Sequence, residues 1–340
     1  MPVKHWSFAG LVLTGWCNAS CASCYLCCSP ERTEQMSSES ALSLWGQLID
    51  ASPHGCRVHL TGGEPLGDWP RLIDLCRRAR AAGLGPLQKI ETNAFWATDA
   101  AVVRERLRAL DAAGMEKLTI STDPYHQQHV PIERCRLASR VGEEVLGRQR
   151  VQVRWRDWLE EGMDTGSLDA GERLELFARW AASGRDRLSG RAAALLGPLL
   201  PCRPAGAYAD SPCREALLRS RHVHVDPAGR IMPGTCAGIV LGTSAQRPRP
   251  RGAGTPDEAP VEGSVGQVWR RLEADHGRRA VVGVLAAGGP VGLLAEAREG
   301  GFVPRAGYAD KCQLCWELRR WFVARGQHAD ELAPAWMYRP

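Results

Sequence analysis

The chain has 340 residues, of which 44% are hydrophobic and 24% charged, a balance that excludes a wholly disordered protein. At about 100–200 residues per domain, this length corresponds to one large domain or two. The formal net charge of +5 is too small to indicate a polyanion-binding protein, which argues against nucleic acid as a partner.

Strand-like and helical segments alternate up to about residue 160. Short apolar runs predict strands at 11–14, 57–61, 87–92, 117–122 and 151–155. Apolar residues with a helical period predict helices at 37–50, 69–82, 100–112 and 132–146. Strands that alternate with helices of this length form βα units around a parallel sheet. We therefore predict an α/β fold with at least five βα units.

The pattern changes in the second half of the chain. Helices are predicted at 171–182, 188–196, 265–275 and 310–324, and a β-hairpin at 222–232. The Pro-, Gly- and Arg-rich stretch at 243–261 has no period and predicts a mobile surface loop. A Pro-rich joint near residue 200 predicts a boundary between two domains, 1–200 and 201–340.

The thirteen cysteines are an odd number, and they are clustered at short gaps. This spacing is typical of metal ligands rather than of a disulfide framework, which is usual in short secreted chains. We see no signal-peptide pattern and no apolar run of the ~20 residues that a membrane span needs. We therefore expect a cytoplasmic protein with no membrane partner.

Cys17, Cys21 and Cys24 form a Cys-x3-Cys-x2-Cys run directly after the first predicted strand. Three thiolates on one loop can hold three corners of a cubane iron–sulfur cluster and leave one iron open to another ligand. The loop follows a parallel strand at its carboxyl end, where α/β barrels place their chemistry.

Two alternatives for these cysteines stay open. Cys27 extends the run, so a competing triplet consists of Cys21, Cys24 and Cys27. Two Cys-x2-Cys pairs could also form a structural zinc site, since Cys312 and Cys315 repeat the spacing near the other end of the chain.

A second motif, Gly62-Gly63-Glu64-Pro65, follows the second predicted strand. Two glycines let the backbone approach a ligand closely, and Glu64 offers a carboxylate to a cationic group. Together, the cysteine run and this motif resemble the radical S-adenosylmethionine (SAM) superfamily. One departure is that Ser23 precedes the third cysteine, where the family usually has an aromatic residue, and Tyr25 follows it instead.

The resemblance covers roughly residues 10–160 and implies a partial (βα)6 TIM-like barrel. It implies that the three cysteines hold a [4Fe-4S] cluster whose fourth iron is chelated by SAM. The implied SAM contacts, in the motif and at the next two strand ends, are Gly62, Gly63, Glu64, Pro65, Asn93, Ser121 and Asp123.

His126 and His129 follow the fourth predicted strand and face the presumed cavity. They are candidate catalytic residues that would bind substrate or transfer protons. The alternative is that either is a surface histidine or lies at a helix start.

The cysteines of the second half resemble the SPASM/twitch type of auxiliary-cluster domain. The resemblance implies a smaller C-terminal domain with one auxiliary [4Fe-4S] cluster, held by Cys213, Cys236, Cys312 and Cys315. Cys202 could replace Cys213, and a zinc site of the same four thiolates is the alternative. His222 and His224 alternate on the hairpin, where they could line the cavity, bond to cluster sulfurs or be solvated.

The reaction that the resemblance implies is reductive cleavage of SAM to a 5′-deoxyadenosyl radical, which abstracts hydrogen from the substrate. The expected substrate is a small-molecule natural product or a peptide, with the auxiliary cluster assisting oxidation or carbon–sulfur bond formation. The expected electron donor is a protein such as flavodoxin or ferredoxin. Two alternatives are a ribosomal peptide maturase that acts with a separate leader-binding protein, and a non-catalytic zinc-binding adaptor.

Overall fold

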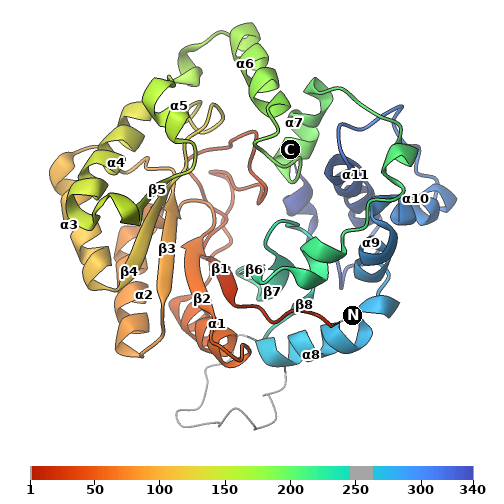
Figure 1. Cartoon of the computed structure of the whole chain (residues 1–340), viewed down its shortest axis with the longest axis horizontal. Helices are drawn as coiled ribbons and strands as arrows, with labels where there is room; N and C mark the ends of the chain where they lie inside the picture. The colour runs from red at the N-terminus through yellow and green to blue at the C-terminus, as the bar shows by residue number, and fades with distance from the viewer. Residues whose placement is uncertain (1, 246–262, 340) are drawn as a thin grey trace.

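The computed structural model describes residues 2–245 and 263–339, so most of the predicted loop at 243–261 lies outside the described residues. One eight-stranded sheet runs through the molecule in the order β5-β4-β3-β2-β1-β6-β7-β8 (Figure 1). Its strands are β1 (Phe8–Val12), β2 (Arg57–Thr61), β3 (Leu87–Thr92), β4 (Met115–Ile120), β5 (Val151–Val153), β6 (His222–Val225), β7 (Arg230–Pro233) and β8 (Gly242–Thr243).

The N-terminal half confirms the α/β prediction. Strands β1 to β5 pair in parallel, each with its neighbour in the chain. The connecting helices are α1 (Ser38–Asp50), α2 (Trp69–Ala81), α3 (Ala100–Ala112) and α4 (Ile132–Leu146). These helices cover the outer face of the curved sheet, as expected for a partial barrel (Figure 1).

Alternation of side chains along the strands separates the two faces of this sheet. On β1, Ala9 and Leu11 are fully buried in the main apolar core, which also includes Leu44 and Trp45 of α1. The Ser37 side chain caps α1 by accepting a hydrogen bond from the Ser40 amide. The opposite face of the strands lines the inside of the barrel.

The sixth parallel strand comes from the second half of the chain. Strand β6 pairs with β1 rather than with β5, so that Phe8 lies opposite His222 and Gly10 opposite His224. The predicted hairpin is confirmed, since β7 runs antiparallel to β6. The sheet is therefore open beyond β5, and α5 (Arg156–Glu161), α6 (Ala170–Ala182) and α7 (Arg191–Leu195) follow that strand instead.

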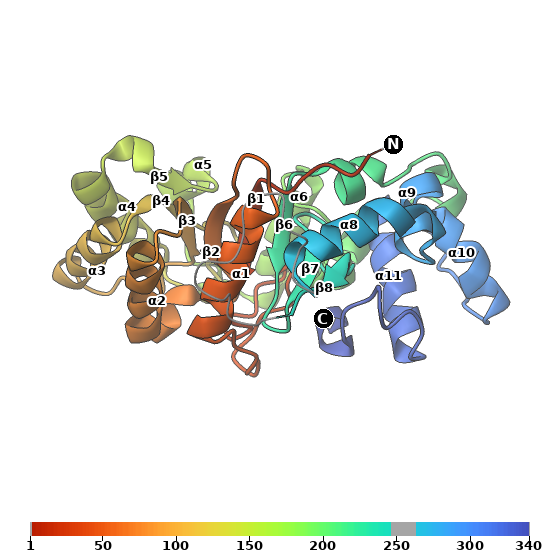
Figure 2. The same cartoon turned by 90° about the horizontal axis from the view of Figure 1, so that it is seen from below.

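The helices of the second half lie beyond the hairpin. They are α8 (Val265–Asp275), α9 (Val282–Gly288), α10 (Pro290–Glu299) and α11 (Lys311–Ala324). Figure 2 shows them on one side of β1, with α1 to α4 on the other. The boundary near residue 200 stays a prediction, because one sheet contains strands from both proposed units. Among the helices that the structure describes, none has the length and apolar character that crossing a membrane requires.

Candidate functional site

The cysteine loop is hydrogen-bonded along its backbone to the Gly-Gly-Glu-Pro turn. The Gly63 amide donates to the Thr14 carbonyl at 2.7 Å, and the Glu64 amide donates to the Trp16 carbonyl at 3.0 Å. A Cβ atom at Gly63 would lie 1.8 Å from the Trp16 carbonyl oxygen. The chain approaches so closely here that only glycine fits.

Gly62 is required for a second reason. Its φ is +138°, a conformation that residues with a side chain rarely adopt, and a Cβ atom there would lie 2.6 Å from the Thr14 carbonyl oxygen. The two glycines of the motif therefore hold the start of the cysteine loop in place, whatever else they contact.

A buried arginine ties the other end of the loop. The Arg191 guanidinium, 5% exposed, donates to the carbonyls of Cys21 at 2.9 Å and Cys28 at 3.0 Å. Its backbone amide donates to the Cys24 carbonyl at 3.0 Å. Sequence reasoning missed Arg191, because nothing in an arginine-rich chain distinguishes it before the fold brings it to the loop.

The structure brings Cys17, Cys21 and Cys24 close enough to influence one another. Burial, with smaller contributions from the neighbouring Glu64 and Cys24, raises the pKa of Cys17 to about 12. Burial, Asp123 and the other two thiols raise the pKa of Cys21 as well. These thiols must lose their protons before they can bind a metal, so metal binding releases protons.

The side chains of Cys27 and Cys28 have different hydrogen-bond partners. The Cys27 thiol donates to the Met337 carbonyl at 3.2 Å, in the C-terminal segment. Cys28 instead stays beside Cys24, whose sulfur accepts a hydrogen bond from the Cys28 amide at 3.4 Å. A hydrogen bond with Cys28 lowers the pKa of Cys24, and the charge of Arg191 contributes to the same effect. This placement favours the triplet 17, 21 and 24 over the competing one that includes Cys27.

The thiols are not gathered as tightly as the sulfurs of a single zinc site. The sulfurs of a tetrahedral zinc site lie about 3.8 Å apart, given Zn–S bonds of about 2.3 Å. Within residues 2–245 and 263–339, the only group of three or more potential ligands within 4.8 Å of one another consists of histidines. Among the described cysteines, no three sulfurs therefore lie within 4.8 Å of one another.

Glu64 is buried, and its carboxylate joins the ends of two strands. Its oxygens accept hydrogen bonds from the Thr92 hydroxyl at 2.8 Å, the Asn93 amide at 2.7 Å and the Leu66 amide at 3.0 Å. Burial raises the pKa of Glu64 to about 7 in spite of these bonds. Glu64 therefore has a structural task at this edge in addition to the expected contact with a cationic group.

Asn93 connects the third strand to the cysteine loop. Its side-chain amide lies 3.6 Å from the Cys17 sulfur and donates to the Asn18 side-chain oxygen at 2.9 Å. A donor aimed at a cysteine sulfur stabilises negative charge there, which is one of the ways in which proteins set cluster potentials.

The end of the fourth strand holds a buried charge pair. The Asp123 and His126 side chains approach to 2.8 Å, and Asp123 is fully buried. Burial lowers the pKa of His126, but the Asp123 carboxylate outweighs it and raises the pKa overall. His129 is half-buried, and burial followed by the charge of His126 lowers its pKa. Ser121 is half-buried, and its amide donates to the carbonyl that ends the third strand.

A second group of thiols lies in the C-terminal half. Burial, followed by Cys315, raises the pKa of Cys213 to about 11, and Cys236 contributes to the same rise. Burial also raises the pKa of Cys312, with Cys236 and Cys315 adding to the shift. These four predicted ligands come from the segment before β6, the turn after β7 and the start of α11. Cys202 is exposed, and its thiol donates to the Leu200 carbonyl, which favours Cys213 as the ligand.

Comparison with known proteins adds the following. No protein-family model matches the chain, and no curated protein matches it. Among solved structures, it is similar to BtrN in complex with AdoMet and 2-DOIA, with 14% identity over 85% of this chain and 90% of that chain, and a TM-score of 0.46. It is also similar to anSMEcpe with bound AdoMet and Cp18Cys peptide, with 12% identity, 95% and 98% coverage, and a TM-score of 0.44.

A further similar structure is Streptococcus suis SuiB bound to S-adenosylmethionine. Its identity is 10%, with 67% of this chain and 60% of that chain covered and a TM-score of 0.29. The identities are 10 to 14% and the TM-scores are below 0.5. The function proposed for this chain therefore depends on its own cysteine loop and glycine turn.

The variant Gly63→Ala should detach the cysteine loop, because its Cβ atom would displace the backbone of Trp16. We expect a loss of about 3 kcal/mol in the free energy of unfolding and poor iron retention after reconstitution. The matched control is Gly206→Ala, where an added Cβ atom has no neighbour within 4 Å. Wild-type stability and iron content in Gly63→Ala would contradict this account of the turn.

The variant Asn93→Leu removes the donor near the Cys17 sulfur. The reduction potential of the N-terminal cluster should become more negative by roughly 40 mV, if the hydrogen bond contributes about 1 kcal/mol to the reduced state. A redox titration followed by electron paramagnetic resonance measures this shift. Gln152→Leu, at an exposed position of β5, is the control and should leave the potential unchanged. An unchanged potential in Asn93→Leu would show that the amide does not act on the cluster.

Proposed function

We propose that this chain is a radical SAM enzyme. Cys17, Cys21 and Cys24 would hold a [4Fe-4S] cluster, with one iron left open for SAM. When bound, this group supplies reductive cleavage of SAM to a 5′-deoxyadenosyl radical that abstracts hydrogen from the substrate. The observation that carries the proposal is the pair of backbone hydrogen bonds between the three-cysteine loop and the Gly62–Pro65 turn. Both segments lie at the carboxyl edge of a parallel sheet.

The chain's own residues would bind and orient SAM at this edge. The turn formed by Gly62, Gly63, Glu64 and Pro65 ends strand β2, while Asn93 and Ser121 follow strands β3 and β4. Carboxyl ends of neighbouring parallel strands meet at one edge, which supports a single binding place. Holding SAM and substrate there while excluding water is the protein's share of such chemistry.

His126, which pairs with the expected SAM contact Asp123, is the candidate for handling a proton or anchoring the substrate. Since Asp123 raises the pKa of His126, the imidazole carries its proton to a higher pH than a free histidine would. His126 is therefore suited to donating a proton or to binding an anionic group of the substrate. His129, whose pKa is lowered, would serve as the neutral neighbour.

The second thiol group would hold an auxiliary [4Fe-4S] cluster through Cys213, Cys236, Cys312 and Cys315. After burial, the nearby Cys236 and Cys315 add to the raised pKa of both Cys213 and Cys312, which supports this set. The auxiliary cluster would assist oxidation or carbon–sulfur bond formation on a small-molecule natural product or a peptide. A flavodoxin or a ferredoxin would supply the electron, and the cytoplasm is the expected compartment.

Iron, labile sulfide and 5′-deoxyadenosine release test this proposal on anaerobically reconstituted protein. We expect about eight irons per chain in the wild type and about four after Cys17/Cys21/Cys24→Ala, with complete loss of SAM cleavage. About four irons should also remain after Cys312/Cys315→Ala, but SAM cleavage should persist.

The matched control is Cys27→Ala, because Cys27 lies in the same loop but directs its thiol to the C-terminal segment. It should keep both the iron and the cleavage activity. Loss of cleavage in Cys27→Ala alone would favour the competing triplet. Zinc with little iron in the wild type would replace the proposal with the non-catalytic zinc-binding adaptor.

A further inference from the structure

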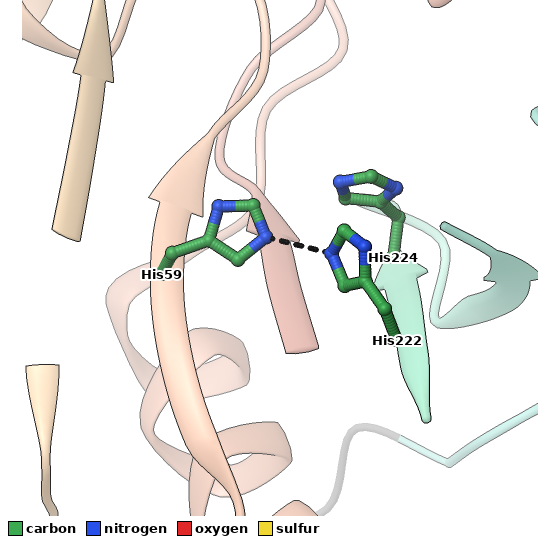
Figure 3. Close-up of side chains that lie close together, drawn as sticks. All are labelled: His59, His222 and His224. Carbon is green, nitrogen blue, oxygen red and sulfur yellow. Dashed lines mark hydrogen bonds between the residues drawn. The ribbon is translucent and has the colours of Figure 1, made fainter. Parts of the chain in front are cut away.

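Three histidines meet on the inner face of the barrel, below the cysteine loop. His59 comes from β2, and His222 and His224 come from β6 (Figure 3). His59 and His224 are 1% and 3% exposed, and His222 is half-buried. The two strands are not neighbours, since β1 lies between them. One sequence-based alternative had both hairpin histidines exposed to solvent, whereas His224 is buried and His222 is half-buried.

The ring nitrogens of these histidines are placed as metal ligands are. Each offers one nitrogen, and the three nitrogens lie within 4.8 Å of one another. His59 Nε2 and His222 Nε2 are 3.0 Å apart and share a hydrogen bond, which Figure 3 draws as a dashed line. Nitrogens on a tetrahedral ion with bonds of about 2.0–2.1 Å lie about 3.3 Å apart. Small side-chain rotations would therefore bring all three onto one ion.

The strand between them leaves room for this group. Gly10 of β1 lies opposite both His59 and His224 in the sheet. A Cβ atom at Gly10 would lie 2.3 Å from His224 Cδ2 and 2.4 Å from His59 Nε2. The absence of a side chain on the middle strand is what allows histidines from the two flanking strands to converge.

The surroundings resemble the outer shell of a metal site. Glu91 Oε1 lies 3.4 Å from His59 Nδ1, and the same carboxylate is held by Lys89 at 2.6 Å and by the Thr61 hydroxyl at 2.8 Å. A carboxylate facing one histidine nitrogen fixes the ring's orientation and directs the other nitrogen, here the one hydrogen-bonded to His222, toward the group.

His224 supplies an independent indication. Its Nδ1 is buried, and within the described part of the chain it has no hydrogen-bond partner. Its Nε2 lies 3.3 Å from the hydroxyl of Tyr25, a residue of the cysteine loop. A buried polar atom without a partner is costly, and a bound ion would remove that cost.

We propose that His59, His222 and His224 bind one divalent first-row transition-metal ion, separate from both thiol groups. Three imidazoles and no thiolate suit zinc, iron, nickel or copper in the divalent state rather than magnesium or calcium. Three protein ligands leave a coordination position for water or a substrate oxygen inside the barrel. The site goes beyond the proposed function, since it uses none of the residues assigned to the clusters or to SAM.

The full-length, iron-reconstituted protein is washed with chelator and titrated with Zn²⁺ alone. We expect one tight zinc equivalent, with X-ray absorption showing only nitrogen or oxygen neighbours at about 2.0–2.1 Å. His222→Ala should weaken zinc binding by more than about 100-fold, because even loss of an outer-shell partner costs about 10–100-fold. Glu91→Gln should show that smaller, 10–100-fold loss.

The matched control is His54→Ala, since His54 is an exposed histidine outside this group. It should bind zinc as the wild type does. Unchanged iron content and circular dichroism in His222→Ala separate loss of the site from misfolding. A sulfur shell at about 2.3 Å, no retained zinc, or equal binding by folded His222→Ala would overturn the proposal. The iron count and SAM cleavage are measured separately on the same protein, so failure of the histidine site can be told apart from failure of the radical SAM proposal.

Discussion

The backbone pairing between the cysteine loop and the Gly-Gly-Glu-Pro turn is the contact on which the site depends. Two backbone hydrogen bonds, from Gly63 to Thr14 and from Glu64 to Trp16, hold the loop without involving any thiol. They form only because positions 62 and 63 carry no side chain. Arg191 then secures the far end of the loop, so the three thiols are presented by a segment held at both ends. Such preorganisation lowers the cost of assembling a cluster.

Strand β1 is the second organising element. It pairs with β2 on one side and β6 on the other, and so joins the two halves of the chain in one sheet. Its carboxyl end leads into the cysteine loop, while Gly10, near its middle, makes room for the three histidines. Tyr25 connects the cysteine loop to the histidines, since it follows Cys24 in the loop and its hydroxyl contacts His224.

Much of the fold could be predicted because the signals are local. The strands 57–61 and 87–92 and the helices 100–112 and 132–146 have the predicted bounds, since alternation, helical period and capping residues all agree there. The thiol triplet was also visible from its spacing. Helix α7 begins at Arg191 rather than at 188, because Gly190 has a φ of +58°.

What could not be predicted depends on long-range pairing. The position of β6 beside β1 is set by contacts more than 200 residues apart, which no local pattern contains. For the same reason, sequence reasoning left His222 and His224 open and gave His59 no role at all. Arg191 and Asn93 act on the loop from separate elements, so their distances to Cys21 and Cys17 appear only in the folded chain.

The central claim is that three thiols of one loop leave a cluster corner open for SAM. Electron paramagnetic resonance of the reduced holoprotein, recorded with and without SAM, tests this most directly. The account predicts that SAM changes the g values of the N-terminal cluster and that Cys27→Ala shows the same change. A cluster signal that SAM leaves unaltered would contradict the account, because it would mean that no iron is open to SAM.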